Sequence, residues 1–238
     1  MTITEQHTLP PITATTAPIT LDLYKDIHKG IRVELFSVTA EAGRLDPSQG
    51  IARAALATHV NDVVHLLTGH AEHEDAAIQP VLEARLPDLA ERIEVDHLTL
   101  DARMDELVEM AAEAASLTVV DAGSKVHRIY LALASFTSDY LRHQDVEERV
   151  VMPSLEAAVG FPEVLTIHQA ILAGMPPEEM AKGLAVMIPA MNIDDRTTLL
   201  GGMRAGAPAE VFDGVWSLVG SVLDPDDHRA LARRLDLD

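Results

Sequence analysis

The sequence predicts an all-α protein: an antiparallel four-helix bundle followed by an all-helical C-terminal extension. Of its 238 residues 47% are hydrophobic, yet only 3% are aromatic. Such a core of aliphatic residues, Ala and Met favours helices, because β-sheets depend on aromatic and β-branched side chains. From residue 21 onward, apolar residues recur at steps of three and four, the period of a helix with one buried face. The length fits one domain plus an appendage.

Four long segments carry this helical period. Asp46 and Pro47 supply a capping residue and a first-turn proline ahead of the second segment. We expect the four helices at about 21–41, 46–84, 87–116 and 121–160. Shorter helical stretches, separated by prolines and glycines, follow Phe161-Pro162. The expected division is a disordered Thr/Pro-rich tail over 1–20, the bundle over 21–158 and the extension over 159–238.

The composition excludes several classes of function. The net charge of −20 repels phosphate backbones and anionic lipid, so we expect no nucleic acid and no membrane as a partner. The absence of Cys excludes disulfides, iron–sulfur clusters, thiolate zinc sites and cysteine nucleophiles. Residues 1–20 have no Lys or Arg and do not resemble a secretory signal, and no apolar run reaches the ~20 residues of a membrane helix. We therefore expect a soluble cytoplasmic protein.

An internal repeat carries the candidate chemistry. Residues 70–84 and 143–157 are identical at six of fifteen positions, and Asp75 and Glu148 are similar in kind. Both copies begin with the pattern HxxxE, and a helix with one inward His precedes each copy. In HxxxE, the two side chains project from one face of a helix, one turn apart. If the two hairpins pack antiparallel, four His and two carboxylates converge in the core: His28, His70, Glu74, His97, His143 and Glu147.

These six residues are the predicted metal ligands. A single His on an apolar face is usually a hydrogen-bonded core residue. Burying all six without a metal would cost several kcal/mol, because buried charges and unpaired imidazoles are both penalised. Imidazole and carboxylate ligands without thiolate suit iron, manganese or zinc. A metal-free helical scaffold remains the alternative.

Other residues on the same helix faces are weaker candidates for a role at the metal site. Tyr140 and Tyr24 lie one turn before a predicted ligand, where a phenol could hydrogen-bond a bridging oxygen or ligate iron, although core packing is the commoner role. Pro80 and Pro153 should kink their helices beyond the site.

The remaining histidines are not predicted to be ligands. His73 fits the surface better than a place beside the ligands, and His59 shares the inward face three turns away, where a channel or core role is open. His65 and His127 should be solvated. His168 could reach the mouth of the bundle, but a structural role is favoured.

The pattern of His28, His70-x-x-x-Glu74, His97 and His143-x-x-x-Glu147 resembles the hemerythrin-like (HHE cation-binding) family over residues 21–158. The chain resembles particularly the actinobacterial members that carry an all-helical C-terminal extension. It implies two Fe ions in an oxo- or hydroxo-bridged di-iron centre, with bridging carboxylates and terminal His ligands. No catalytic residue separate from the metal centre is implied.

The chain also departs from the oxygen carriers of this family. They have a fifth terminal His in an HxxxH motif and an HxxxxD motif, whereas this chain has His97-x-x-x-Asp101 and HxxxE. We therefore expect binding of, or reaction with, O2, nitric oxide or peroxide rather than oxygen carriage, and we leave open whether the protein is a peroxidase-like enzyme.

Other functions remain alternatives to this one. The protein could instead be an iron, oxygen or redox sensor or interaction module in which metal loading orders the bundle; iron storage is a weaker third option. The apolar stripe around Trp216 is either core or a dimer surface, so a homodimer through the C-terminal helices stays open.

Overall fold

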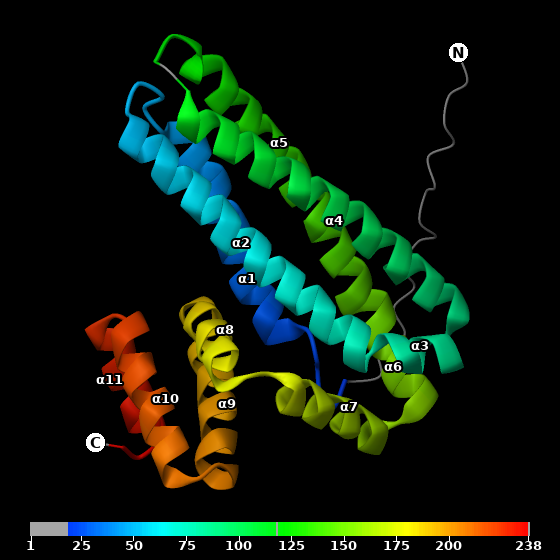
Figure 1. Ribbon diagram of the computed structural model, residues 1–238. Helices are drawn as coiled ribbons and strands as arrows, with labels where there is room; N and C mark the ends of the chain where they lie inside the picture. The colour runs from blue at the N-terminus through cyan, green and yellow to red at the C-terminus, as the bar shows by residue number, and fades with distance from the viewer. Residues whose placement is uncertain (1–18, 118, 238) are drawn as a thin grey trace.

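Four long antiparallel helices form the body of the molecule in the computed structural model, which describes residues 19–117 and 119–237 (Figure 1). All regular elements in these residues are helices, so the predicted all-α bundle with a helical extension is confirmed. The bundle helices are α1 (Lys25–Arg44), α2 (Gly50–Ala77), α4 (Pro87–Ser116) and α5 (Val119–Val146). The expected tail over 1–20 lies outside the described residues, apart from its last two.

The bundle interior contains two apolar clusters with a polar layer between them. One cluster includes Leu35, Leu56, Leu100 and Phe136 and fills the longer part of the bundle. The other, which includes Ile78, Ile93, Val151 and Leu155, fills the end where the short helices lie. α4 and α5 pass from one cluster to the other, whereas α1 and α2 lie mainly in the first cluster, and the second is reached at Tyr24, just before α1, and at Ala77, the end of α2. The predicted ligands lie between the two clusters. Apolar packing therefore seals the polar layer on both sides.

The two helices of the repeat are interrupted at or beyond the candidate ligands, where Pro80 and Pro153 were expected to kink them. α2 ends at Ala77, and a separate helix α3 (Gln79–Arg85) follows, because Pro80 has no N–H for the carbonyl group four residues earlier. After α5, the chain forms a π-helix η1 (Glu147–Val151) and then α6 (Met152–Val159). Pro153 explains this turn in the same way. π-turns inside helices are frequent at functional sites.

The start of the first helix also differs from the expectation. α1 begins at Lys25 rather than Leu21, because the Asp22 carboxylate accepts the backbone N–H groups of Tyr24 and Lys25, both at 3.0 Å. A carboxylate in this position satisfies donors that a helix start leaves free.

The C-terminal extension has its own core. It consists of α8 (Pro177–Ala190), α9 (Ile193–Gly206), α10 (Ala209–Val222) and α11 (Pro225–Arg234), which bury Leu184, Ile188, Leu200, Phe212, Val219 and Leu231. The preceding helix α7 (Phe161–Gly174) packs on α2 and α6 instead, and its Val164 and Ile167 join a bundle cluster. The domain boundary at residue 158 stays a prediction.

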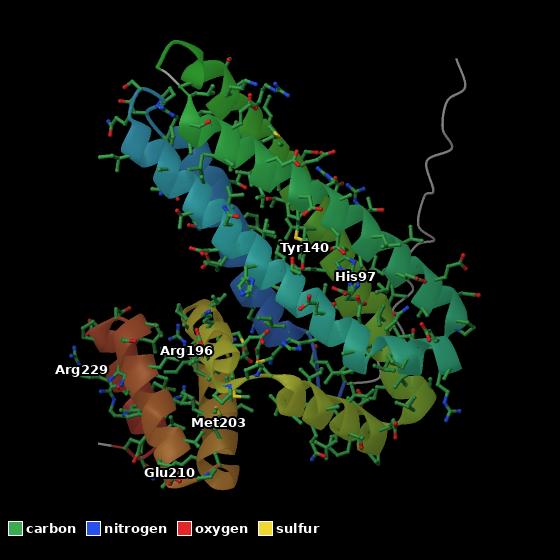
Figure 2. The ribbon with its side chains drawn as sticks, viewed as in Figure 1. His97, Tyr140, Arg196, Met203, Glu210 and Arg229 are labelled. Carbon is green, nitrogen blue, oxygen red and sulfur yellow. The ribbon has the colours of Figure 1, made fainter. Side chains whose placement is uncertain are left out.

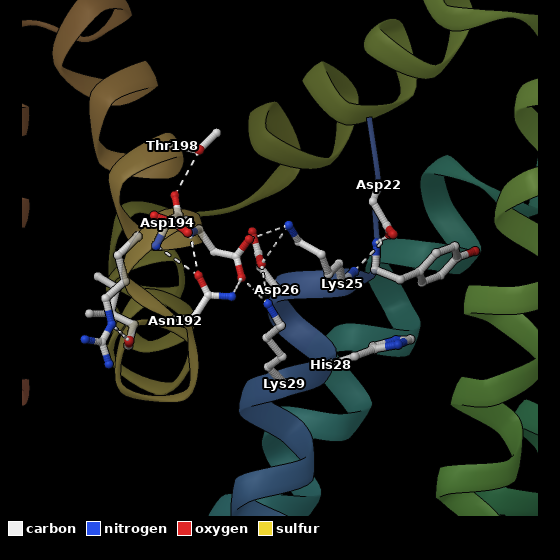
Figure 3. A network of polar contacts seen from close by, with 12 residues as sticks. Asp22, Lys25, Asp26, His28, Lys29, Asn192, Asp194 and Thr198 are labelled. Atoms are coloured by element: carbon white, nitrogen blue, oxygen red, sulfur yellow. Dashed lines mark hydrogen bonds and ion pairs between the residues drawn. The ribbon is translucent and has the colours of Figure 1, made fainter. Parts of the chain in front are cut away.

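The extension contacts the bundle on α1. Lys25 and Lys29 of α1 both bond to Asp195 at the start of α9, with Lys25 Nζ 2.6 Å from its carboxylate (Figure 3). A Cβ atom on Gly30 would lie 2.7 Å from Val186 of α8. Glycine at this position therefore allows α1 and α8 to approach closely.

Among the described residues, no single helix is both long enough and apolar enough to cross a membrane. One pair of helices, Ala122–Val159 and Phe161–Gly174, has the required length and apolar character only when the two are taken together, and this pair is bent by 118°.

Candidate metal centre

The polar layer brings the six predicted ligands together from the four long helices. His28 comes from α1, His70 and Glu74 from α2, His97 from α4, and His143 and Glu147 from the end of α5 and the first turn of η1. All are buried except His70, which is partly buried. Figure 2 shows His97 and Tyr140 among the bundle helices. That the six clustered His and Glu residues bind metal stays a prediction.

These residues divide into two groups that share both carboxylates. One group is His28, His70, Glu74 and Glu147, and the other is Glu74, His97, His143 and Glu147. Within each group the candidate ligand atoms all lie within 4.8 Å of one another. The arrangement pairs the His of α1 and α2 on one side and the His of α4 and α5 on the other, which the sequence left open.

Each carboxylate directs one oxygen toward each His pair. Glu74 Oε1 lies 3.0 Å from His70 Nε2, and its Oε2 lies 3.4 Å from His97 Nε2. Glu147 Oε2 lies 3.4 Å from His28 Nε2, and its Oε1 lies 3.0 Å from His143 Nε2. A carboxylate placed in this way can bridge two ions, one held by each His pair.

The polar atoms of the layer are not satisfied by the protein itself. Both oxygens of Glu74, Oε2 of Glu147 and Nε2 of His97 are buried and have no hydrogen bond with any described residue. The Nε2 atoms of His28 and His70 face each other at 3.1 Å. Buried carboxylates and imidazoles without partners are costly. A pair of cations that accept nitrogen and oxygen ligands, such as iron, manganese or zinc, would satisfy these atoms, so the residues fit a dinuclear site.

Without bound cations, the histidines themselves compensate the charge of the carboxylates. Burial alone would lower the pKa of His97, but the carboxylates of Glu147 and Glu74, whose oxygens lie 3.9 Å and 3.4 Å from Nε2, raise that pKa to about 11. Burial likewise lowers the pKa of His143, but the negative charge of Glu147 more than offsets this effect and raises the pKa to about 9. The layer therefore favours positive charge, either as protons or as metal ions.

Two further carboxylates hold the outer ring nitrogens of the histidines. Asp75 Oδ1 lies 2.9 Å from Nδ1 of His97, and Glu148 Oε1 lies 2.9 Å from Nδ1 of His28. Arg32 also donates to Glu148, at 2.7 Å. Burial would raise the pKa of Glu148, but the hydrogen bonds with His28 and Arg32 lower it to about 2. These contacts orient each ring so that Nε2 faces the layer.

That Asp75 and Glu148 hold the outer ring nitrogens of the histidines was not predicted from the sequence. The signal for it was present, since each acidic residue directly follows the HxxxE glutamate of its repeat copy. The sequence could not show which histidine each carboxylate contacts, because that histidine lies on another helix than the carboxylate.

Tyr24 and Tyr140 border the layer from opposite sides. The ring of Tyr24 lies 5.2 Å from that of His28 and belongs to one apolar cluster, while the ring of Tyr140 lies 5.7 Å from that of His143 and belongs to the other. Burial, followed by the negative charges of Glu74 and Glu147, raises the pKa of both phenols well above their ordinary range. Both tyrosines are therefore neutral side chains at the edge of the site.

The other histidines lie outside the two groups. His59 does not face a channel: its Nδ1 lies 2.6 Å from Glu41 on α1, at the partly exposed edge between two helices. His73 contacts Glu179 of α8 at 2.8 Å rather than any candidate ligand. His65 and His127 are exposed, as expected, and His168 is partly buried on α7.

The sharing of the carboxylates predicts unequal effects of ligand substitutions. Glu147→Ala should lose both ions, because both groups contain Glu147, whereas His143→Ala should first lose the ion of its own group. Elemental analysis of each purified variant after metal loading measures the ions bound per chain. The exposed Glu83, the repeat counterpart of Glu156, provides the control, and Glu83→Ala should bind metal like the wild type. Wild-type metal content in Glu147→Ala would rule out the shared-carboxylate arrangement.

The histidine pKa values predict how pH affects the metal-free protein. An unfolded His has a pKa of about 6.5. The folded-state pKa values of His97 and His143 are raised, so their stabilising contribution is complete below that pH and is lost as pH rises through about 9 and then about 11.

We therefore expect the free energy of unfolding of the metal-free protein to fall between about pH 7 and pH 10. Metal binding needs neutral imidazoles, so it should release protons, and metal affinity should rise with pH. Denaturation curves with and without metal, and calorimetry in buffers of different ionisation enthalpy, measure both effects. Metal uptake without proton release would contradict this charge balance.

Comparison with known proteins identifies the bundle. The family model of the hemerythrin HHE cation binding domain matches residues 20–155. No curated protein and no solved structure matches the chain. Membership of an actinobacterial subgroup stays a prediction. Since the matched domain covers more than half of the chain and contains all six clustered His and Glu residues, the protein belongs to the hemerythrin HHE cation-binding family.

Proposed function

We propose that this protein holds a di-iron centre that binds or reacts with O2, nitric oxide or peroxide. The observation that carries the proposal is the pair of His groups with two shared carboxylates. Each group offers two imidazole nitrogens and one oxygen from each carboxylate, which are four donors for an ion that commonly takes five or six. Iron in such a site supplies Lewis acidity and redox chemistry at the positions that the protein leaves open.

The packing around the layer favours a small reactant. The side chains of His28 and Glu147 are 0% and 1% exposed, and apolar clusters lie on both sides of the layer. A diatomic molecule or peroxide can enter such a site, whereas a larger substrate would require the helices to separate. Water exclusion also strengthens the electrostatic interactions of the buried carboxylates.

Asp101 lies where the oxygen carriers have a further terminal His, and its position supports this proposal. Asp101 is exposed and is absent from both groups, although it lies one turn after His97. The two groups therefore have two His each, and none of the described residues supplies a fifth. Equal groups favour reactivity over the carriage of oxygen at one end of the centre.

The experiment that tests the proposal measures metal content and visible spectrum together. The aerobically purified protein should contain close to two irons per chain, and nitric oxide or peroxide should change its near-ultraviolet and visible absorption. Glu147→Ala should lose both the iron and the response, because that carboxylate serves both groups. A protein that carries redox-silent zinc instead of iron would rule out the reactive centre and leave only a structural metal site.

A sensor is the second candidate, favoured by where the extension docks. Lys25, Lys29 and Gly30 surround His28 on α1, and all three contact α8 or α9. Figure 3 shows His28 pointing away from this contact. His73 and Glu179 add a contact close to His70. We propose that a shift of α1 on metal loading would reach the extension through these residues. A cytoplasmic location and a homodimer stay predictions.

Hydrogen exchange of α8 with and without metal tests the sensor. In the wild type, removing the metal should raise exchange across α8, because α1 no longer holds it in place. Gly30→Ala should raise exchange in both states, since its Cβ would meet Val186. Gly183→Ala is the control, because no atom lies within 4 Å of the Cβ that it adds to α8. If hydrogen exchange in α8 of the wild type were the same with and without metal, metal loading would not be coupled to the extension.

A further inference from the structure

A cavity of about 220 Å³ lies between α4 and α5, directly outside the candidate metal centre. His143 forms part of its wall, and five charged side chains also line it: Arg92, Asp96, Arg103, Asp139 and Arg142. The proposed di-iron function uses none of these five residues. The cavity is therefore a separate feature that adjoins one candidate ligand.

The outer nitrogen of His143 differs from those of His28 and His97. The latter two have a carboxylate oxygen 2.9 Å from Nδ1. Nδ1 of His143 is buried and has no hydrogen bond with any described residue, and the nearest carboxylate oxygen, on Asp96, lies 3.7 Å away. Because the side chain of His143 is only 4% exposed, this nitrogen is a buried polar atom, and the Asp96 carboxylate beside it also lines the cavity.

The cavity has a charge opposite to that of the molecule. Its three arginines exceed its two aspartates, whereas the whole chain has a net charge of −20. Arg103 and Arg142 both pair with Asp139, but Arg92 has no ion pair with any described acidic side chain. A guanidinium group presents several donors in a fixed plane and binds oxyanions through paired hydrogen bonds.

We propose that this cavity binds a small inorganic oxyanion, which accepts hydrogen bonds from the arginines and, when the Asp96 carboxylate turns away from His143, from Nδ1–H of that ring. When Nε2 of His143 faces a cation, its hydrogen resides on Nδ1, so the ring donates toward the cavity. Water occupies about 30 Å³ in the liquid, so the volume accommodates an oxyanion of four or five heavy atoms together with several waters. The bound anion would take the place at His143 that Asp75 takes at His97.

Calorimetry on the full-length, metal-loaded protein tests the site with nitrate, phosphate and hydrogencarbonate at low ionic strength. At least one of these anions should bind saturably, and Arg92→Gln should weaken its binding about tenfold, because a charge-assisted hydrogen bond is lost. Arg128→Gln is the matched control, since Arg128 is exposed on α5 and does not line the cavity. Asp96→Asn should strengthen binding, because it removes a competing negative charge.

Several results would overturn the proposal. They are the absence of saturable binding by all three anions, equal weakening in Arg92→Gln and Arg128→Gln, and acetate binding more tightly than any inorganic oxyanion. A crystal soaked in selenate gives a readout that does not depend on variants: its anomalous peak should lie in the cavity beside His143, and a peak elsewhere would oppose the assignment. No gas or peroxide is used, so a negative result leaves the proposed di-iron function unaffected.

Discussion

The structure depends on placing two carboxylates, Glu74 and Glu147, in one buried layer. Two negative charges at this depth are strongly unfavourable unless positive charge lies between or beside them. The fold provides for this charge by directing the Nε2 atoms of four histidines at the carboxylate oxygens from all four helices. In the metal-free protein, protons on the histidines neutralise the layer, and in the loaded protein cations take over that task. The same charge balance at the two carboxylates therefore governs both metal binding and the stability of the bundle.

The surroundings of the layer increase this demand for cations. Asp75 and Glu148 add two negative charges just outside it, where they hold the Nδ1 atoms of His97 and His28. They orient the rings and make the imidazoles better ligands, although they raise the charge that must be balanced. The apolar clusters on either side prevent water from screening these charges. Cations that accept nitrogen and oxygen ligands would satisfy this demand.

Much of this arrangement follows from helical periodicity. In HxxxE, the four-residue step fixes both side chains on one face, and the repeat makes the second half of the site resemble the first, so the six clustered residues could be predicted. Pro80 and Pro153 predicted kinks beyond the site, but the sequence could not show the form of each break, a separate helix after Ile78 and the π-helix η1, because that form depends on how the chain adapts to a missing proline N–H. His59 shares the face of His70, because eleven residues are close to three full turns, but this face borders α1, where the ring contacts Glu41 at a partly exposed edge instead of lining a channel.

The contacts between elements have no comparable signal in the sequence, and they make the two halves of the centre unequal. The ligands follow an approximate two-fold repeat, but their environments do not. On the side of His28 and His70, α7 and α8 pack against the outer faces of α2 and α1. On the side of His97 and His143, a charged cavity opens between α4 and α5 instead. An internally repeated bundle would by itself produce two equivalent metal positions. The extension on one side and the cavity on the other therefore give each half of the candidate centre its own environment.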